Sequence, residues 1–105
     1  MLEDLDLDRS LQLALDDLAF GTPTDVQLQV IPLALAGADL RVSAPTGSGK
    51  TLAYLLPALQ SLLREPLAPN GGTLMLVLVP TRELARQVLK SCRQLLAKST
   101  LRADA

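Results

Sequence analysis

Apolar residues recur every three or four positions over about residues 9–19, and this spacing predicts a first helix. Turn-forming residues at 20–23 end that pattern. Thr24 then predicts the N-cap of a second helix, and Gln27, three positions later, completes a possible capping box. We expect this second helix to run to about Ala36 and to stop at the glycine that follows.

Two further segments, 40–43 and 74–79, are apolar without a helical period and are predicted to be strands. The second has six unbroken apolar residues, which is typical of a parallel strand buried on both faces. Helices are expected after each strand, over about 52–63 and 82–97, and a surface loop over 65–72. Strand, helix, strand and helix in this order predict a βαβ unit with a right-handed crossover, and therefore an α/β fold.

Two strands alone cannot cover six consecutive apolar residues on both faces. The chain is therefore either the front part of a larger α/β domain or a piece that borrows a partner's sheet, and we favour the first interpretation. A length of 105 residues with 49% hydrophobic and 20% charged residues suits one globular segment of one domain.

The net charge of −1 hides an asymmetry between the two ends of the chain. Residues 1–27 carry seven acids and one base, whereas residues 81–105 carry six bases and two acids. Such a separation suggests different partners for the two ends. Two solvated faces would also explain it, and on composition alone this is the explanation we favour.

Several classes of protein are disfavoured by composition. The single cysteine, Cys92, cannot form a disulfide within the chain, so we expect a buried, inert thiol and a reducing, cytoplasmic environment. The absence of histidine argues against a zinc site. No signal-peptide pattern is present, and no apolar run approaches the ~20 residues that span a bilayer, so no membrane partner is expected.

Between the first predicted strand and the helix after it lies a candidate phosphate-binding loop. Its residues are Ala44, Pro45, Thr46, Gly47, Ser48, Gly49, Lys50 and Thr51. A glycine-rich turn at a helix start directs backbone N–H groups and the helix dipole at an anion. Lys50 can reach the outer phosphates and Thr51 offers a hydroxyl to Mg2+. The usual pattern opens with glycine, where this chain has Ala44.

The start of the last predicted helix is a second candidate anion site, because it follows the carboxyl end of the second strand. The Thr81 hydroxyl and the Arg82 guanidinium could both face a phosphate there. Arg82 opposes the helix dipole, and an anionic partner would remove that penalty. Glu83 offers a purely structural compensation, so both explanations remain open.

The same predicted helix has an apolar face and a basic stripe that spans less than a quarter turn. The stripe consists of Arg82, Arg86, Lys90 and Arg93. Such a stripe can follow a nucleic-acid backbone. A solvated surface is the commoner explanation, and the polyanion reading gains weight only because the stripe begins at the predicted ligand edge.

Three motifs in order resemble those of the DEAD-box RNA helicases. Residues 20–27 resemble the Q motif, residues 44–51 resemble motif I, including its first alanine, and residues 80–87 resemble motif Ia. The resemblance covers nearly the whole chain. It implies the RecA-like parallel sheet of a P-loop NTPase with flanking helices, of which about two strands are present. Residues 1–37 would form the Q-motif region and residues 38–105 the P-loop βαβ unit.

The resemblance also implies roles for single residues. Gln27 would read the adenine edge, with Thr24 either capping its helix or contacting the nucleotide. Phe20 would pack near the base, although a plain core aromatic is almost as good an explanation. Thr81 and Arg82 would contact the RNA backbone without reading sequence. An upstream aromatic residue of the family is replaced by Leu2, which would weaken adenine selectivity.

The implied function is ATP-dependent unwinding or remodelling of RNA duplexes, with ATP and Mg2+ as cofactors and RNA and the rest of a helicase core as partners. The Asp-Glu-Ala-Asp motif, which supplies the second Mg2+ ligand in this family, does not occur in these 105 residues. We therefore expect the chain alone not to hydrolyse ATP. Alternatives are another P-loop helicase or translocase, a nucleotide- or RNA-binding module without catalysis, and a fragment without function.

Overall fold

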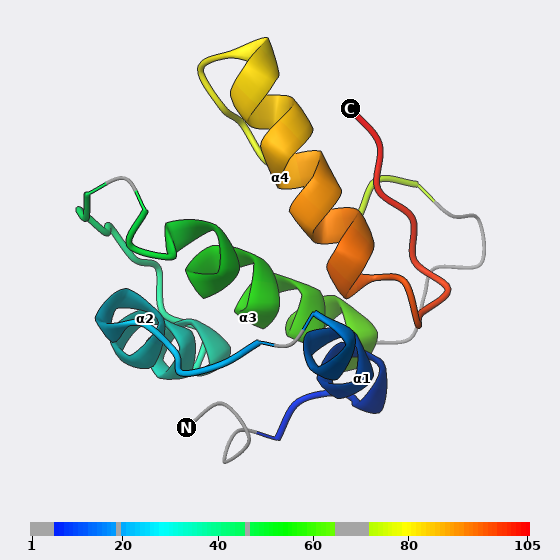
Figure 1. Cartoon of the computed structure of the whole chain (residues 1–105), viewed down its shortest axis with the longest axis horizontal. Helices are drawn as coiled ribbons and strands as arrows, with labels where there is room; N and C mark the ends of the chain where they lie inside the picture. Colours follow the sequence, from blue (N-terminus) through cyan, green and yellow to red (C-terminus); the bar gives the residue numbers. More distant parts are fainter. Residues whose placement is uncertain (1–5, 19, 46, 65–71) are drawn as a thin grey trace.

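Four helices make up the regular structure of the part of the chain that the computed structural model describes, which is residues 6–18, 20–45, 47–64 and 72–105. They are α1 (Arg9–Asp17), α2 (Asp25–Leu35), α3 (Lys50–Arg64) and α4 (Arg82–Leu95) (Figure 1). The four predicted helices are thus confirmed, with α1 and α4 each ending two residues earlier than expected. Leu2, Thr46 and most of the predicted 65–72 loop lie outside the described residues.

The first helix begins at an N-cap that the apolar pattern alone did not predict. The Asp8 carboxylate accepts hydrogen bonds from the backbone N–H of Ser10 at 2.9 Å and from the Ser10 hydroxyl at 2.7 Å. These bonds favour the charged form and lower the pKa of Asp8 below its ordinary value of 3.8. The helix then buries one face, made of Leu11, Ala14 and Leu15.

The end of α2 confirms the predicted glycine stop. Gly37 has φ 92°, a left-handed conformation that glycine adopts without the steric cost of a Cβ atom. The N–H of Ala38 donates to the carbonyl of Leu33 at 3.2 Å, and the N–H of Gly37 donates to the carbonyl of Ala34 at 3.0 Å. This is the Schellman pattern, which satisfies carbonyl groups that the helix end leaves without intrahelical partners.

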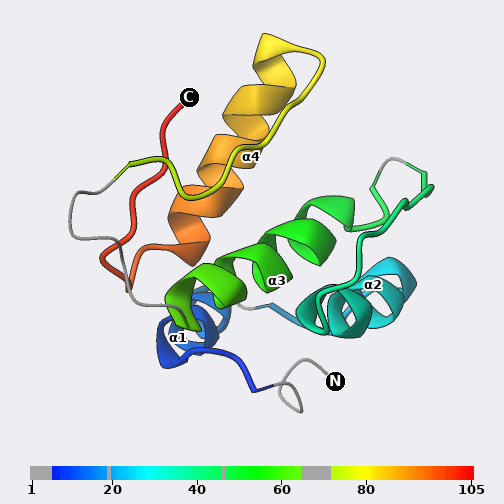
Figure 2. The same cartoon turned by 180° about the vertical axis from the view of Figure 1, so that it is seen from behind.

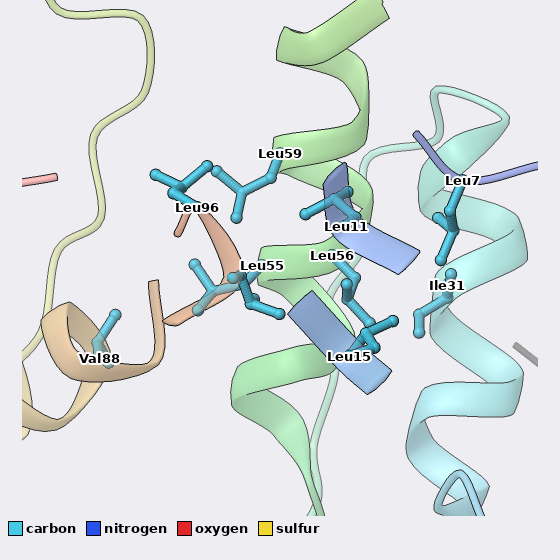
Figure 3. Close-up of a cluster of buried hydrophobic side chains, with 10 residues drawn as sticks. Leu7, Leu11, Leu15, Ile31, Leu55, Leu56, Leu59, Val88 and Leu96 are labelled. Atoms are coloured by element: carbon cyan, nitrogen blue, oxygen red, sulfur yellow. The ribbon is translucent and has the colours of Figure 1, made fainter. Parts of the chain in front are cut away.

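The hydrophobic core lies where α1, α2 and α4 meet α3 (Figures 1 and 3). α3 supplies its centre with Leu55, Leu56 and Leu59, all nearly inaccessible to solvent. The other buried members come from the three flanking elements and the residues beside them: Leu7, Leu11, Leu15, Ile31, Val88, Leu95 and Leu96. The core therefore fixes the direction of α3, whose first residues, Lys50 and Thr51, are the last two residues of the candidate phosphate loop.

The predicted strands are not confirmed, because segments 40–43 and 74–79 carry no regular structure and the described residues form no sheet. The second segment nevertheless alternates like a strand. Its odd-numbered residues pack against the core, while Leu76 and Leu78 on the other side are 76% and 85% exposed. A strand requires ladder hydrogen bonds to a neighbouring backbone, and neither segment makes such bonds among the described residues.

An open apolar cavity of about 720 Å³ lies between α3, α4, residues 72–79 and the C-terminal segment. Figure 2 shows residues 72–79 crossing beside α4, on the side away from α1. Leu55 and Leu59 from α3 line the cavity together with Val88 and Cys92 from α4. Leu74 and Leu76, which also line the cavity, are 45% and 76% exposed, so part of its apolar lining has no covering layer among the described residues.

Among the described residues, an ion pair joins the acidic start of the chain to its basic end. Lys98 Nζ lies 3.1 Å from Asp17 Oδ2, at the C-terminal ends of α4 and α1. Cys92 is half-buried, and burial raises the pKa of its thiol, which agrees with the expected unreactive cysteine. Among the described residues, no helix combines the length and the apolar character required to cross a membrane.

Candidate nucleotide-binding site

The N-terminus of α2 is closed by the predicted capping box. The hydroxyl of Thr24 accepts from the backbone N–H of Gln27 at 3.3 Å. In return, the side-chain oxygen of Gln27 accepts from the backbone N–H of Thr24 at 3.0 Å. Both residues of the predicted nucleotide contact are therefore fixed by the start of their own helix, which confirms the structural role considered for them.

The same glutamine ties α2 to the loop before α3. Gln27 is only 3% exposed, and its amide nitrogen donates to the carbonyl oxygen of Gly49 at 3.2 Å. Gly49 has φ 89°, and a Cβ atom there would lie 2.6 Å from Gln27 Nε2 and 2.8 Å from Thr24 Oγ1. Only glycine fits both the conformation and the space, so the two motifs form one packed unit.

Within the loop, the lysine folds back on the loop's own backbone. Lys50 Nζ donates to the carbonyl oxygen of Ala44, and the N–H of Ser48 donates to the carbonyl of Pro45 at 3.2 Å. Gly47 shares the positive φ of the second loop glycine, at 83°. These two hydrogen bonds hold the ends of the loop together. The Lys50 side chain is exposed, so its ammonium group has room to exchange the Ala44 carbonyl for another acceptor.

The start of α3 is open to an anion. Its first turn contains no acidic residue, in contrast to the first turns of α2 and α4, which contain Asp25 and Glu83. Among the described residues, no acceptor contacts the N–H groups of Thr51 and Leu52. Orphan N–H groups and the positive end of the dipole together favour negative charge at this position.

One residue that the sequence analysis missed lies beside the predicted Mg2+ ligand. Tyr54 is three positions after Thr51, so both lie on the same side of α3. Burial raises the pKa of the Tyr54 hydroxyl, and hydrogen bonding with the Thr51 side chain partly opposes that increase. The three-residue spacing of Thr51 and Tyr54 at a predicted helix is the sequence signal that could have identified this pair.

The residues of the loop fit a triphosphate. The Ser48 hydroxyl is buried and lacks a hydrogen-bond partner among the described residues, so the loop holds a polar group that a ligand could satisfy. The loop adds an exposed cation on Lys50, a hydroxyl on Thr51 and a helix start without acidic residues. These are the donors and charges that a phosphate chain with a bound Mg2+ requires.

Phe20 lies at the edge of the core rather than in open space. It is half-buried, packs against the core cluster, and its N–H donates to the carbonyl of Leu15 at 3.1 Å. The core-aromatic explanation is therefore supported by the packing, and the predicted contact with a base stays a prediction.

The second predicted anion site is separate from the loop. Thr81 is the N-cap of α4, where its hydroxyl accepts from the N–H of Leu84 at 3.1 Å. Arg82 is exposed at the first position of the helix. Figure 1 shows this end of α4 apart from the loop before α3. The two sites are thus independent surfaces, and the role of Thr81 and Arg82 stays a prediction.

Comparison with known proteins agrees with the three motifs. Residues 24–105 match the family model described as DEAD/DEAH box helicase. The chain is 55% identical over 97 residues to the ATP-dependent RNA helicase SrmB of Escherichia coli (strain K12), covering 92% of the chain and 22% of that protein. It is 53% identical over 90 residues to the ATP-dependent RNA helicase dbp9 of Aspergillus niger, covering 84% of the chain and 15% of that protein.

Solved structures show the same likeness in three dimensions. The RNA helicase Prp28 from Chaetomium thermophilum, solved with bound ADP, superposes with a TM-score of 0.83 at 37% identity, covering 92% of this chain and 24% of that chain. The chain spans about a fifth of the length of the curated relatives it matches. The family model covers well over half of the sequence, and the chain belongs to the DEAD/DEAH box helicase family.

Proposed function

We propose that the chain provides the ATP-binding and the first RNA-binding elements of an ATP-dependent RNA helicase that remodels RNA duplexes in the cytoplasm. One observation carries the proposal above the others: the direct contact of Gln27 and Thr24 with Gly49. This contact joins the motif expected to read adenine to the loop expected to hold the phosphates. Relatives named as ATP-dependent RNA helicases support it.

In this proposal Lys50 has two positions. Its ammonium group donates to the Ala44 carbonyl in the structure, and it would turn to the outer phosphates when nucleotide is present. A phosphate oxygen is the stronger acceptor, because it carries negative charge that attracts the ammonium group and the carbonyl oxygen of Ala44 does not. Thr51 would hold Mg2+ through its hydroxyl, and the N–H groups of Gly47 and of the start of α3 would donate to the phosphates together with the Ser48 hydroxyl.

Gln27 would read adenine only after a local opening. A side-chain amide has two donor hydrogens and two acceptor lone pairs, and one of each is used by Gly49 and Thr24. One donor and one acceptor remain, which is the pair that an adenine edge requires. Because the side chain is nearly inaccessible, α2 and the loop must separate slightly before a base can reach it.

Bound ATP with Mg2+ would supply the phosphoanhydride bond whose cleavage drives the helicase cycle. This chain's residues would bind and orient the phosphates, but the acid of the Asp-Glu-Ala-Asp motif, which completes the metal site in this family, does not occur in the sequence. We therefore expect nucleotide binding without useful hydrolysis by these 105 residues.

Nucleotide titration tests the proposal. With Mg2+ present, the purified protein should bind a fluorescent ATP analogue, and ATP should compete better than GTP. Lys50→Ala should abolish binding, whereas Gln27→Ala should keep some binding and lose the preference for ATP. Lys98→Ala, far from the loop, is the matched control. Failure to bind any adenine nucleotide would refute the proposal.

A binding module without catalysis is the second candidate, favoured by the missing acidic motif. Both candidates predict no useful ATP hydrolysis by these 105 residues. Mg2+-dependent phosphate release by the chain, lost in Lys50→Ala, would overturn the binding-only alternative and would also contradict the expectation that hydrolysis needs the acidic motif.

A further inference from the structure

Helix α4 presents a row of positive charge that extends far beyond its N-terminus. Arg82, Arg86, Lys90 and Arg93 are all exposed in the structure, which confirms that the stripe faces solvent. At 1.5 Å of rise per residue, the four cations span about 16 Å along the helix. At 100° per residue they stay within about 80° of one another, so one ligand could contact them all.

Few acids balance this stripe. Glu83 is the single acid of α4, and it lies in the first turn, where it also complements the dipole. Within the described part of the chain, Arg86 and Lys90 form no ion pair, and only Arg93 has a carboxylate partner. The opposite side of α4 is committed to the core through Val88 and Leu95, so the helix cannot turn its charges inward.

At the far end of the stripe, Arg93 is paired with a carboxylate of the same chain, that of Asp104. Arg93 donates to Asp104 Oδ1 at 2.8 Å and to the carbonyl oxygen of Ala103 at 3.1 Å. The guanidinium therefore holds two oxygen acceptors from the C-terminal segment, as it could hold two oxygens of a phosphate. Beside it, Lys90 and Arg86 line a shallow open groove with Leu89 and Gln94.

The charge pattern favours a nucleic-acid backbone over an acidic protein. Cations that follow one another at about 4.5–6 Å along the helix suit a chain with repeated phosphates. The groove offers no deep apolar pocket for the anchoring side chains on which protein interfaces depend. The stripe also begins at Arg82, where RNA contact is expected, so one strand could continue along it.

We propose that the RNA backbone continues from the N-terminus of α4 along Arg86 and Lys90 toward Arg93, as a sequence-independent extension of the RNA site. The inference rests on the proposed function, because it assumes RNA at Arg82. It adds a length requirement: an RNA long enough to follow α4 binds more tightly than one that reaches only the helix start.

Fluorescence anisotropy with labelled oligouridine tests this extension. The double variant Arg86→Gln/Lys90→Gln removes two phosphate contacts, so the slope of log Kd against log salt should fall by about 1.4 for single-stranded RNA. At 0.1 M salt this corresponds to roughly 25-fold weaker binding of a strand of about 20 nucleotides. A strand of about 2 nucleotides, which is too short to follow the stripe beyond the helix start, should bind the variant and the wild type alike.

The matched control is Arg9→Gln/Arg64→Gln, which removes the same charge elsewhere and should leave the salt slope unchanged. If the double stripe variant does not fold, as judged by circular dichroism, Lys90→Gln alone should weaken binding about 5-fold. Equal losses in stripe and control variants, or tighter binding of polyglutamate than of RNA, would overturn the inference. No RNA binding by the wild type at any length would refute the proposed function as well.

Discussion

Replacement of Gly49 by alanine tests whether the contact between α2 and the phosphate loop is as close as the structure shows. The new methyl group would lie 2.6 Å from Gln27 Nε2, so the buried amide would have to move. The left-handed backbone, with φ 89°, costs a non-glycine residue about 1–2 kcal/mol. Displacing Gln27 breaks its bonds to Thr24 and to Gly49, each worth about 0.5–1.5 kcal/mol. The free energy of unfolding should therefore fall by about 2–5 kcal/mol in total.

Gly47→Ala is the matched control, because Gly47 has nearly the same φ, 83°, but no atom lies within 4 Å of its added Cβ. It should cost only the backbone contribution of about 1–2 kcal/mol. Urea unfolding of both variants, followed by circular dichroism, measures the difference. When Gln27 is already replaced by alanine, Gly49→Ala and Gly47→Ala should lower the free energy of unfolding by more similar amounts. Equal costs in the wild-type background would refute the close contact.

Three further predictions concern stability and use the same urea assay. Thr24→Ala should cost about 1 kcal/mol through loss of the α2 cap, and Thr24→Ser should restore most of it; no difference between them would contradict the capping role. Leu55→Ala, at a fully buried site, should cost about 2–5 kcal/mol, whereas the half-exposed Leu33→Ala should change stability by less than about 0.5 kcal/mol. The folded state lowers the pKa of Asp8, so the ionised carboxylate stabilises the fold. The wild type should therefore exceed Asp8→Ala in free energy of unfolding by its full margin above about pH 4, and this margin should decline as the pH falls further. A margin that stays constant down to about pH 2 would exclude the ionised cap.

Much of the candidate site could be predicted because its signals are local. The capping box joins Thr24 to Gln27, three residues away, and Gly37 ends α2 through bonds that reach back three and five residues. Such interactions depend on residue type and short spacing, which a sequence displays directly. The phosphate loop and the first turn of α3 belong to the same class.

What the sequence by itself determined was therefore where the helices lie to within about two residues, which residues cap and end α2, and which run of residues could bind a phosphate. Tertiary structure decided that Gln27 rests on Gly49, 22 residues further along the chain, and that Phe20 packs against the core. It also decided that 40–43 and 74–79 form no sheet among the described residues. The physical reason is that a helix satisfies its hydrogen bonds within one segment, whereas a strand and a buried side chain need a second segment whose position no local pattern fixes.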